Sequence, residues 1–413
     1  MNKNRLLLTL LFFSLSAGVP GLFAPTPKGA ESPGPAAEIP LSDQPGFDEE
    51  DPVAAWGKNS YLTVWQSTRN ESSQIFGARL SSSGQLLQRE SFPISLSPRD
   101  QLFPAISFGA DCYLIVWQDL RGGKNWEIYG ARIGPDGKRL DSADLPIGTG
   151  PGNRKHPAVS WNGRDFLAVW MEERPGTGWD IAGKRISSSG AIVAQDEIAV
   201  SVSPGDQTSP AIGLLQKNFL VVWSDNRSGN SDIYGARIDP SGNNLDPAGF
   251  AISTAPDEQI NPAVASNGNT ADVVWADRRK GEVYAVYGAR ISKEGSLLDP
   301  EGIPLAASAR NHQFPDIACL GPSCYLSWEE ELPRSGPVTG IRSILRDIRG
   351  RIWNPPAASL PAGSDTGEMI LLREGIGNHF SRVSTDGKEY LIVWKDYRSG
   401  PAATYGRLVD PSR

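Results

Sequence analysis

One short pattern recurs along nearly the whole chain and constrains its fold more than any other feature. Seven apolar runs end in a tryptophan, and all but the last pair of successive tryptophans are 52 or 53 residues apart. The last interval is 66 residues, and its extra residues fall around Gly363 to Asn378. A fixed period of this length indicates a repeat architecture rather than unrelated domains. The repeated residues are Trp65, Trp117, Trp170, Trp223, Trp275, Trp328 and Trp394.

Each unit contains the same four short apolar stretches, separated by turn sequences such as Asn162-Gly163. A Pro-led stretch such as Pro157-Ala-Val-Ser comes first and the Trp run second, and the third and fourth resemble Ile233–Ile238 and Phe250–Ser253. No helical periodicity interrupts them. Four strands in about 53 residues are typical of one propeller blade. We therefore predict an all-β fold, a seven-bladed β-propeller of four-stranded antiparallel blades.

The two ends of the repeat array complement each other. Glu38-Ile-Pro-Leu-Ser42 matches the fourth-strand pattern of Phe92-Pro-Ile-Ser95, whereas the last unit stops after a third strand at Thr404–Leu408. The N-terminal strand is therefore expected to complete the last blade and close the ring, which hides both sheet edges of an open array.

The repeated tryptophans are expected to be buried between blades. A hairpin centred near Gly229 places Trp223 opposite Gly235, where the absent side chain leaves room for the indole, with Arg237 diagonal to it and within reach of a cation–π contact. Units with one more residue, such as Trp117 to Gly130, then need a bulge or a longer turn. Burial of one indole removes on the order of 200 Å² from water, or roughly 5 kcal/mol as an upper bound.

An acidic residue lies two positions after most of these tryptophans, and an arginine four positions after. The charges form either a ring around one mouth of the propeller or repeated ion pairs that pin turns and blades. Repetition in nearly every unit favours ion pairs, because a functional site usually breaks symmetry. The acids are Asp119, Glu172, Asp225, Asp277, Glu330 and Asp396, and the arginines are Arg69, Arg121, Arg174, Arg227, Arg279 and Arg398.

Broken symmetry points to a candidate ligand site between the second and third blades. Trp126 and Trp179 occupy matching places before the third strand, and His156 lies on the same expected face, with Glu127 and Asp180 nearby. Two aromatic faces with polar neighbours suit a sugar or a peptide. The alternative is that both indoles pack on neighbouring loops.

The sequence contains no recognisable catalytic motif, and we predict no cofactor and no metal site. The three histidines, His156, His312 and His379, precede first strands of blades spread around the ring, so they are not expected to share a metal. Arabinanases and sialidases also use propellers, so a hydrolase is the enzymatic alternative. It requires two carboxylates at a fixed separation in the central channel. The Asp boxes of sialidases are absent.

The ends and the composition indicate an exported protein. Residues 1–24 resemble a signal peptide, with an uncleaved anchor as the alternative, and 25–37 form a Pro/Gly/Ala-rich leader before a single domain at 38–413. A net charge of −7 and a pI near 5.2 argue against nucleic acid and anionic membranes as partners. We expect a monomer without membrane insertion of the mature chain. Cys319 and Cys324 flank a turn and could form a disulfide, which leaves Cys112 as a buried thiol.

The pattern resembles the repeats of secreted bacterial β-propeller proteins of the type VVW-x-D-x-R…DIYGAR. Val221–Arg227 and Asp232–Arg237 carry the resemblance, which extends over nearly the whole mature chain, while the sixth unit departs from it at Glu329–Arg334. The resemblance implies the fold and export to the periplasm or the extracellular space, but no particular reaction. We therefore expect a binding or protein-interaction module. A glycosidase-like hydrolase and an envelope scaffold that binds through its outer rim are the alternatives.

Overall fold

The computed structural model describes residues 37–42, 46–69, 71–95, 97–194, 196–332, 345–354, 369–376, 379–397 and 400–411. The predicted signal peptide, nearly all of the predicted leader and Arg398 lie outside these ranges. Within them every regular element is a β-strand, and residues Ala36–Arg413 form one compact unit. Among the described residues there is no helix that is both long and apolar enough to cross a membrane.

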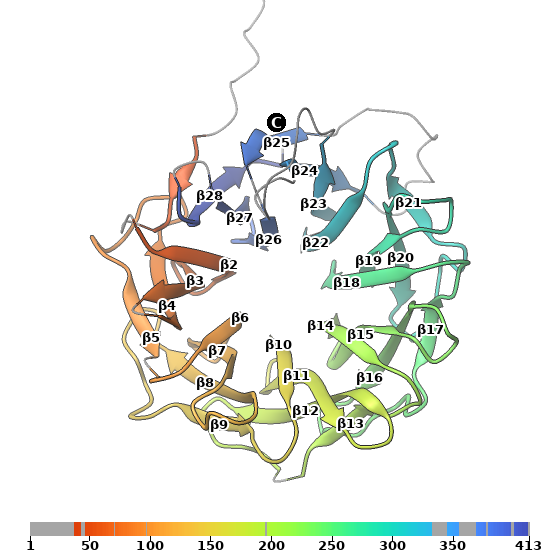
Figure 1. Cartoon of the computed structure of the whole chain (residues 1–413), viewed down its shortest axis with the longest axis horizontal. Coiled ribbons are helices and arrows are strands. Elements are labelled where there is room, and N and C mark those ends of the chain that lie inside the picture. The colour runs from red at the N-terminus through yellow and green to blue at the C-terminus, as the bar shows by residue number, and fades with distance from the viewer. Residues whose placement is uncertain are drawn as a thin grey trace, which may run out of the picture. The chain divides into compact units, whose positions relative to one another are not determined.

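Short strands separated by Gly-, Pro- and Asn-containing turns form seven four-stranded antiparallel sheets, as the sequence predicts (Figure 1). The first blade comprises β2 (Asp48–Trp56), β3 (Tyr61–Arg69), β4 (Ser72–Leu80) and β5 (Phe92–Ser95). The second comprises β6 (Gln101–Gly109), β7 (Cys112–Asp119), β8 (Glu127–Ile133) and β9 (Leu145–Gly148). The third comprises β10 (Arg154–Trp161), β11 (Asp165–Arg174), β12 (Gly178–Ser187) and β13 (Ile198–Ser201).

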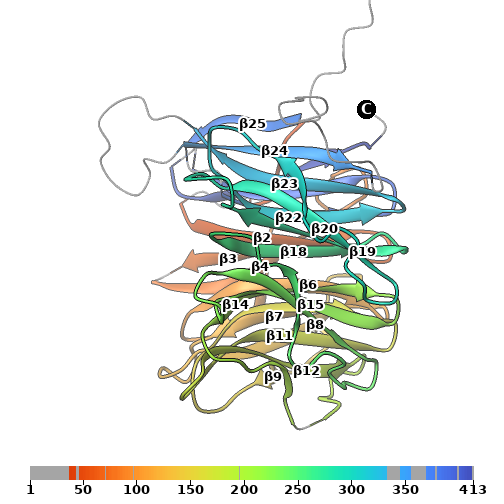
Figure 2. The same ribbon diagram turned by 90° about the vertical axis from the view of Figure 1, so that its right-hand side faces the viewer.

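The remaining blades follow the same order, and in each of them the first strand is innermost (Figure 1). Figure 2 shows the blades stacked side by side when the ring is turned by 90°. The fourth blade comprises β14 (Gln207–Leu215), β15 (Asn218–Asp225), β16 (Asp232–Ile238) and β17 (Phe250–Ser253), and the fifth β18 (Gln259–Ser266), β19 (Thr270–Asp277), β20 (Ala285–Ser292) and β21 (Ile303–Ala306). The sixth comprises β22 (His312–Leu320), β23 (Ser323–Glu331), β24 (Leu345–Trp353) and β25 (Met369–Ile376). The seventh comprises β26 (His379–Thr385), β27 (Tyr390–Asp396), β28 (Ala403–Val409) and β1 (Ile39–Pro40).

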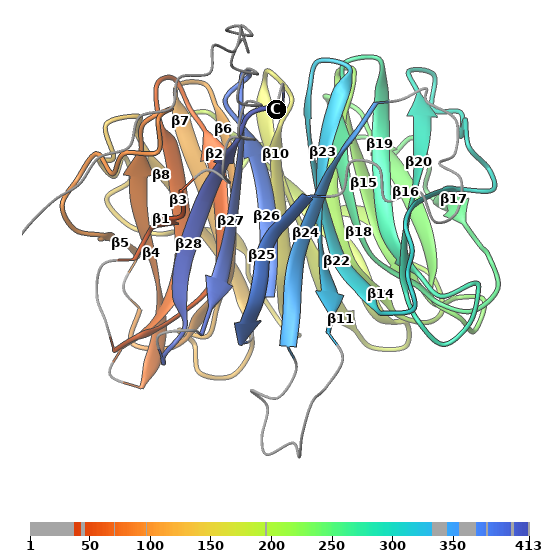
Figure 3. The ribbon, with the colours of Figure 1, turned by 90° about the horizontal axis from the view of Figure 1, so that it is seen from above.

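The predicted closure by the N-terminal strand is confirmed. β1 pairs antiparallel with β28, with Ile39 opposite Gly406 and Pro40 opposite Tyr405. The inner strands contact their neighbours all the way round, including β26 against β2. Figure 3 shows the strands running between the two faces of the closed ring.

The closing seam differs from four of the six other seams between blades. In four blades an arginine of the third strand donates to a backbone carbonyl of the next blade, as Arg132 Nη1 does to Ser188 O at 2.7 Å and Arg237 Nη1 to Glu294 O at 2.9 Å. At the closing seam Leu408 replaces the arginine. A Cβ on Gly84 of the first blade would lie 2.6 Å from Ile39 Cδ1 and 3.3 Å from Leu408 Cδ1, so this contact is apolar and close.

All seven repeated tryptophans are fully buried, but the predicted register around them is wrong by one residue. Asp225 pairs with Asp232, so Trp223 lies opposite Tyr234 and Val222 lies opposite Gly235. A slip of one residue changes both the partner and the face. The indole does lie over a bare backbone position, because a Cβ on Gly249 would meet Trp223 Cζ2 at 3.0 Å.

Two other details of these hairpins follow from the observed register. Arg237 does not face the indole but pairs with Asp246 at 2.8 Å, whereas Arg227 lies 4.2 Å over the Tyr234 ring. The extra residue in the second blade lengthens the turn between β7 and β8 rather than adding a bulge between Trp117 and Gly130.

In four blades the Trp–acid–Arg pattern forms an ion pair within the hairpin rather than a ring of charges around a mouth. In the fourth blade Trp223 Nε1 donates to Asp225 Oδ2 at 2.8 Å, and Arg227 Nε donates to Asp225 Oδ1 at 2.8 Å. The same contacts recur around Asp119 and Asp277, and all three carboxylates are fully buried. The acid therefore links the buried indole to the arginine at the end of the strand.

The cysteine prediction is also confirmed. Cys319 and Cys324 form a disulfide, and Cys112 is a buried free thiol whose pKa is raised by burial.

Candidate functional site

The inner strand of every blade has one residue with a left-handed backbone at the same place. The ladder to the second strand skips this residue and the one after it. A proline follows in six of the seven blades, and proline has no N–H to donate to the ladder. We call these seven residues the channel ring: Asp51, Phe103, His156, Ser209, Asn261, Phe314 and Phe380, with φ between 50° and 55°.

The neighbouring blade holds the channel ring in this conformation. Phe103 N donates to Gln66 Oε1 at 3.0 Å, and His156 N donates to Gln118 Oε1 at 3.1 Å. Each acceptor directly follows a repeated tryptophan, and Ser224 and Glu329 do the same for Asn261 and Phe380. A left-handed conformation costs a residue with a Cβ about 1–2 kcal/mol, so these contacts between blades offset strain.

The channel ring surrounds a pocket of about 440 Å³ on the propeller axis, which we call the central pocket. Two aromatic pairs contribute to its wall: Phe103 and His156, with ring centroids 4.4 Å apart, and Phe314 and Phe380, 5.2 Å apart. Burial and the neighbouring Lys155 lower the pKa of His156, so its imidazole is neutral at pH 7. The wall is therefore largely aromatic on these two sides.

Polar groups complete the central pocket. Ser209 and Asn261 lie on adjacent blades, with Ser209 Oγ 3.5 Å from Asn261 Oδ1, and Asp51 lies on the first blade. A ligand in the pocket would thus meet hydroxyl, amide and carboxylate groups as well as aromatic faces.

Two further residues of the lining break the repeat. Asp316 and Arg382 stand where the second to fifth blades have alanine after the proline. Val383 N donates to Asp316 Oδ2 at 2.7 Å. Burial deep in the ring raises the pKa of Asp316, and the positive charge of Arg382 opposes that shift. The central pocket thus contains one carboxyl group that holds its proton more tightly than an ordinary aspartate.

The structure separates the residues of the predicted ligand site. His156 lines the central pocket, whereas Trp126 and Trp179 lie at the seams to the following blades. Trp126 N donates to Asn153 Oδ1 at 3.1 Å, and Trp179 N donates to Asp206 Oδ1 at 3.0 Å. The two tryptophans do occupy matching places, as predicted, but each lies at its own seam, and among the described residues no ring contact joins the two indoles.

The two acids of that predicted site are engaged in contacts within the protein. Glu127 Oε1 accepts from Gly150 N at 3.2 Å, which ties down the chain before the third blade. Asp180 is fully buried and accepts from Thr177 Oγ1 at 2.8 Å, and burial raises its pKa. Neither acid lines the central pocket.

The other possible metal ligands are dispersed or already bonded. His312 packs on Trp328 with ring centroids 6.0 Å apart, away from the central pocket, and the His379 side chain lies outside the described residues. Among the described residues, Asp272, Cys319 and Cys324 bring three ligand-type atoms within 4.8 Å of one another. Both sulfurs belong to the disulfide, so in this state they offer no thiolate for a metal.

Sequence reasoning missed most of the channel ring. The position could be identified in the sequence as the residue before the first-strand proline. Its side chain differs from blade to blade, so a search for repeated residues misses it. Pro315-Asp316 and Ser381-Arg382, which stand where the second to fifth units have Pro-Ala, could also have been identified as departures from the repeat.

The closed ring of seven four-stranded blades, with a pocket on its axis, defines the chain as a seven-bladed β-propeller. No family model and no curated protein matches the sequence. Similar solved structures include a subtype N11 neuraminidase-like protein (H18N11, flat-faced bat, Peru), at 10% identity and a TM-score of 0.47 over 82% of this chain and 94% of that one. An endo-arabinase from Bacteroides thetaiotaomicron has 14% identity and a TM-score of 0.40 over 61% and 96%. YjhT has 9% identity and a TM-score of 0.47 over 76% and 96%. Similarities this low carry no information about ligand or activity.

Proposed function

We propose that the protein is an exported binding module that takes its ligand in the central pocket. The observation that carries this proposal is the contrast between the repeated core of the blades and the channel ring. The buried tryptophans and their turns recur from blade to blade, whereas the seven equivalent positions of the channel ring carry five different side-chain types. Packing alone gives no reason for such variety, because the equivalent backbone sites have the same conformation. An asymmetric set of polar and aromatic groups around one pocket is what a specific ligand requires.

The chemistry of the wall favours a glycan or a peptide segment. Phe103 with His156, and Phe314 with Phe380, offer two apolar aromatic surfaces, while Ser209, Asn261 and Asp51 offer hydrogen-bonding groups. Sugars and peptides present apolar faces beside hydroxyl or amide groups, so they match a wall of this kind.

A glycan and peptide binding screen tests the proposal, and its hits are then measured with channel-ring variants. Phe103→Ala removes one aromatic surface and is expected to weaken binding at least tenfold, which is about 1.4 kcal/mol. The double variant Trp126→Ala/Trp179→Ala is the matched control and should bind as the unmodified protein does. Loss of binding in the control together with full binding by Phe103→Ala would place the ligand at the seams and refute the proposal.

A carbohydrate-active hydrolase is the second candidate, and one observation favours it. The central pocket contains two carboxyl groups, those of Asp51 and Asp316, and the raised pKa of Asp316 suits a proton donor. If glycan hits are cleaved, Asp316→Asn should abolish cleavage while leaving binding in place. Cleavage that survives Asp316→Asn would exclude this assignment.

A further inference from the structure

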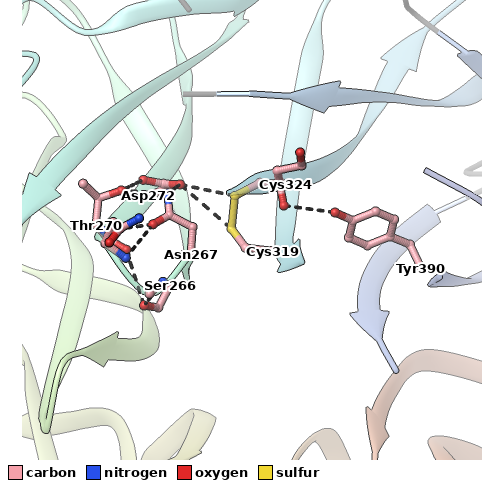
Figure 4. The surroundings of a disulfide bond; sticks show 10 residues. Ser266, Asn267, Thr270, Asp272, Cys319, Cys324 and Tyr390 are labelled. Atoms are coloured by element: carbon pink, nitrogen blue, oxygen red, sulfur yellow. Dashed lines mark hydrogen bonds between the residues drawn. A yellow bond between two sulfur atoms is a disulfide. The ribbon is translucent and has the colours of Figure 1, made fainter. Parts of the chain in front are cut away.

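The disulfide lies at the seam between the fifth and sixth blades (Figure 4). Cys319 and Cys324 face each other across the hairpin of β22 and β23. Asp272 of β19, in the fifth blade, points at both sulfurs. Its Oδ2 lies 3.2 Å from Cys324 Sγ and 3.9 Å from Cys319 Sγ.

The two cysteines differ in exposure to solvent. Cys324 is fully buried, with 0% of its surface exposed, whereas Cys319 is only half-buried. A thiolate that cleaves a disulfide bonds to one sulfur and expels the other. An external thiolate can therefore reach Cys319, and Cys324 is the sulfur that leaves.

The expelled sulfur is the one closer to Asp272. A disulfide sulfur carries no hydrogen, so a hydrogen bond between Asp272 Oδ2 and Cys324 Sγ requires the proton to be on the carboxyl group. Burial raises the pKa of Asp272 to about 6. Hydrogen bonds from Thr270 Oγ1 at 2.6 Å and Asn267 Nδ2 at 2.9 Å fix the orientation of the carboxyl group.

Two other charged groups act on Asp272. Arg290 lowers its pKa and Asp299 raises it, and these two form an ion pair with each other at 2.8 Å. Their effects on Asp272 largely oppose one another, so burial against the apolar seam decides the direction of the shift.

We propose that the Cys319–Cys324 disulfide is a site of thiol–disulfide exchange, attacked at Cys319, with Asp272 as the acid that protonates Cys324. The attacking thiolate, from a small thiol or a dithiol protein, forms a bond with Cys319 Sγ as the Cys319–Cys324 bond breaks. The bonding electron pair goes to Cys324 Sγ, which takes the proton from Asp272 Oδ2. The products are a mixed disulfide at Cys319, a thiol at Cys324 and the Asp272 carboxylate.

The attacked sulfur can be identified in the unmodified protein. The protein is treated with glutathione, quenched with acid, unfolded and alkylated, and digested for peptide mass spectrometry. The proposal predicts glutathione on Cys319 alone and the alkyl group on Cys324, while Cys112, a buried thiol in the folded state, carries the alkyl group and no glutathione. Glutathione on Cys324, or an equal mixture, would overturn the assignment.

The role of Asp272 is tested by the pH dependence of reduction by dithiothreitol. The rate constant, expressed per dithiothreitol thiolate, should fall in the unmodified protein as the pH rises through about 6. Asp272→Asn keeps the shape of the side chain but has no acidic proton, so its profile should be flat and about 10²-fold lower at pH 5. An unchanged profile in Asp272→Asn would refute the role.

Asp299→Asn is the matched control. It keeps the proton donor but removes the negative charge that raises the pKa of Asp272. The fall in rate should therefore persist and move to lower pH. A flat profile in this control would show that the charge of the pair, and not the proton of Asp272, determines the rate.

Discussion

Replacing Leu41 by alanine is expected to lower the free energy of unfolding by about 2–5 kcal/mol, the range for buried leucines. Leu41 is almost fully buried, in a cluster that joins Tyr61 and Leu80 of the first blade to Leu391 and Val393 of the seventh. The substitution thus weakens the contact that closes the ring. Urea unfolding measures the loss.

Ile94 provides a matched control, because it occupies the same fourth-strand position in the first blade, whose four strands are continuous in sequence. Ile94→Ala should cost a similar free energy. Only Leu41→Ala should also raise hydrogen exchange in β28, because β1 can detach without unfolding its own blade. Equal exchange protection of β28 in the two variants would contradict the closing role of β1.

Replacing Asp225 by alanine is expected to destabilise the protein by about 3–5 kcal/mol, because it leaves a charged partner and a buried donor without their acceptor. Asp225 is fully buried and accepts from Trp223 Nε1 and Arg227 Nε, each at 2.8 Å. Trp223→Phe removes the indole donor and part of the buried ring but leaves Asp225 with Arg227, so it should cost less, about 1–3 kcal/mol.

Asp136→Ala is the control for this prediction, since Asp136 pairs with Lys138 at 3.2 Å on the surface. Surface ion pairs contribute about 0–1 kcal/mol, so this variant should unfold nearly as the unmodified protein does. If Asp225→Ala were as mild as Asp136→Ala, the buried acids would not link the indoles to the arginines.

Most of the fold could be predicted from the sequence repeat. Its period predicted the number of blades, and the unfinished last unit predicted the pairing of Ile39 with β28. The register around Trp223 could not be read so closely, because the centre of a hairpin depends on which residues close the turn. The observed centre differs from the predicted one by half a residue, so Trp223 pairs with Tyr234 instead of Gly235.

The candidate site was less readable than the fold. The sequence predicted His156 as a site residue but grouped it with Trp126 and Trp179, since the turn before each third strand and the start of each first strand were expected on the same face. The central pocket instead combines one short stretch from each blade, and which side chains meet there depends on the closure of the ring. The contact between Asp272 and Cys324, 52 residues apart, likewise appears only when adjacent blades dock.

A crystal structure of the protein with a glycan or peptide found by the screen would test the central pocket most directly. Our account predicts that the ligand lies on the propeller axis, in contact with Phe103, His156 and Phe314. A ligand bound on the outer rim or at the seams beside Trp126 and Trp179, with the axis unoccupied, would contradict it.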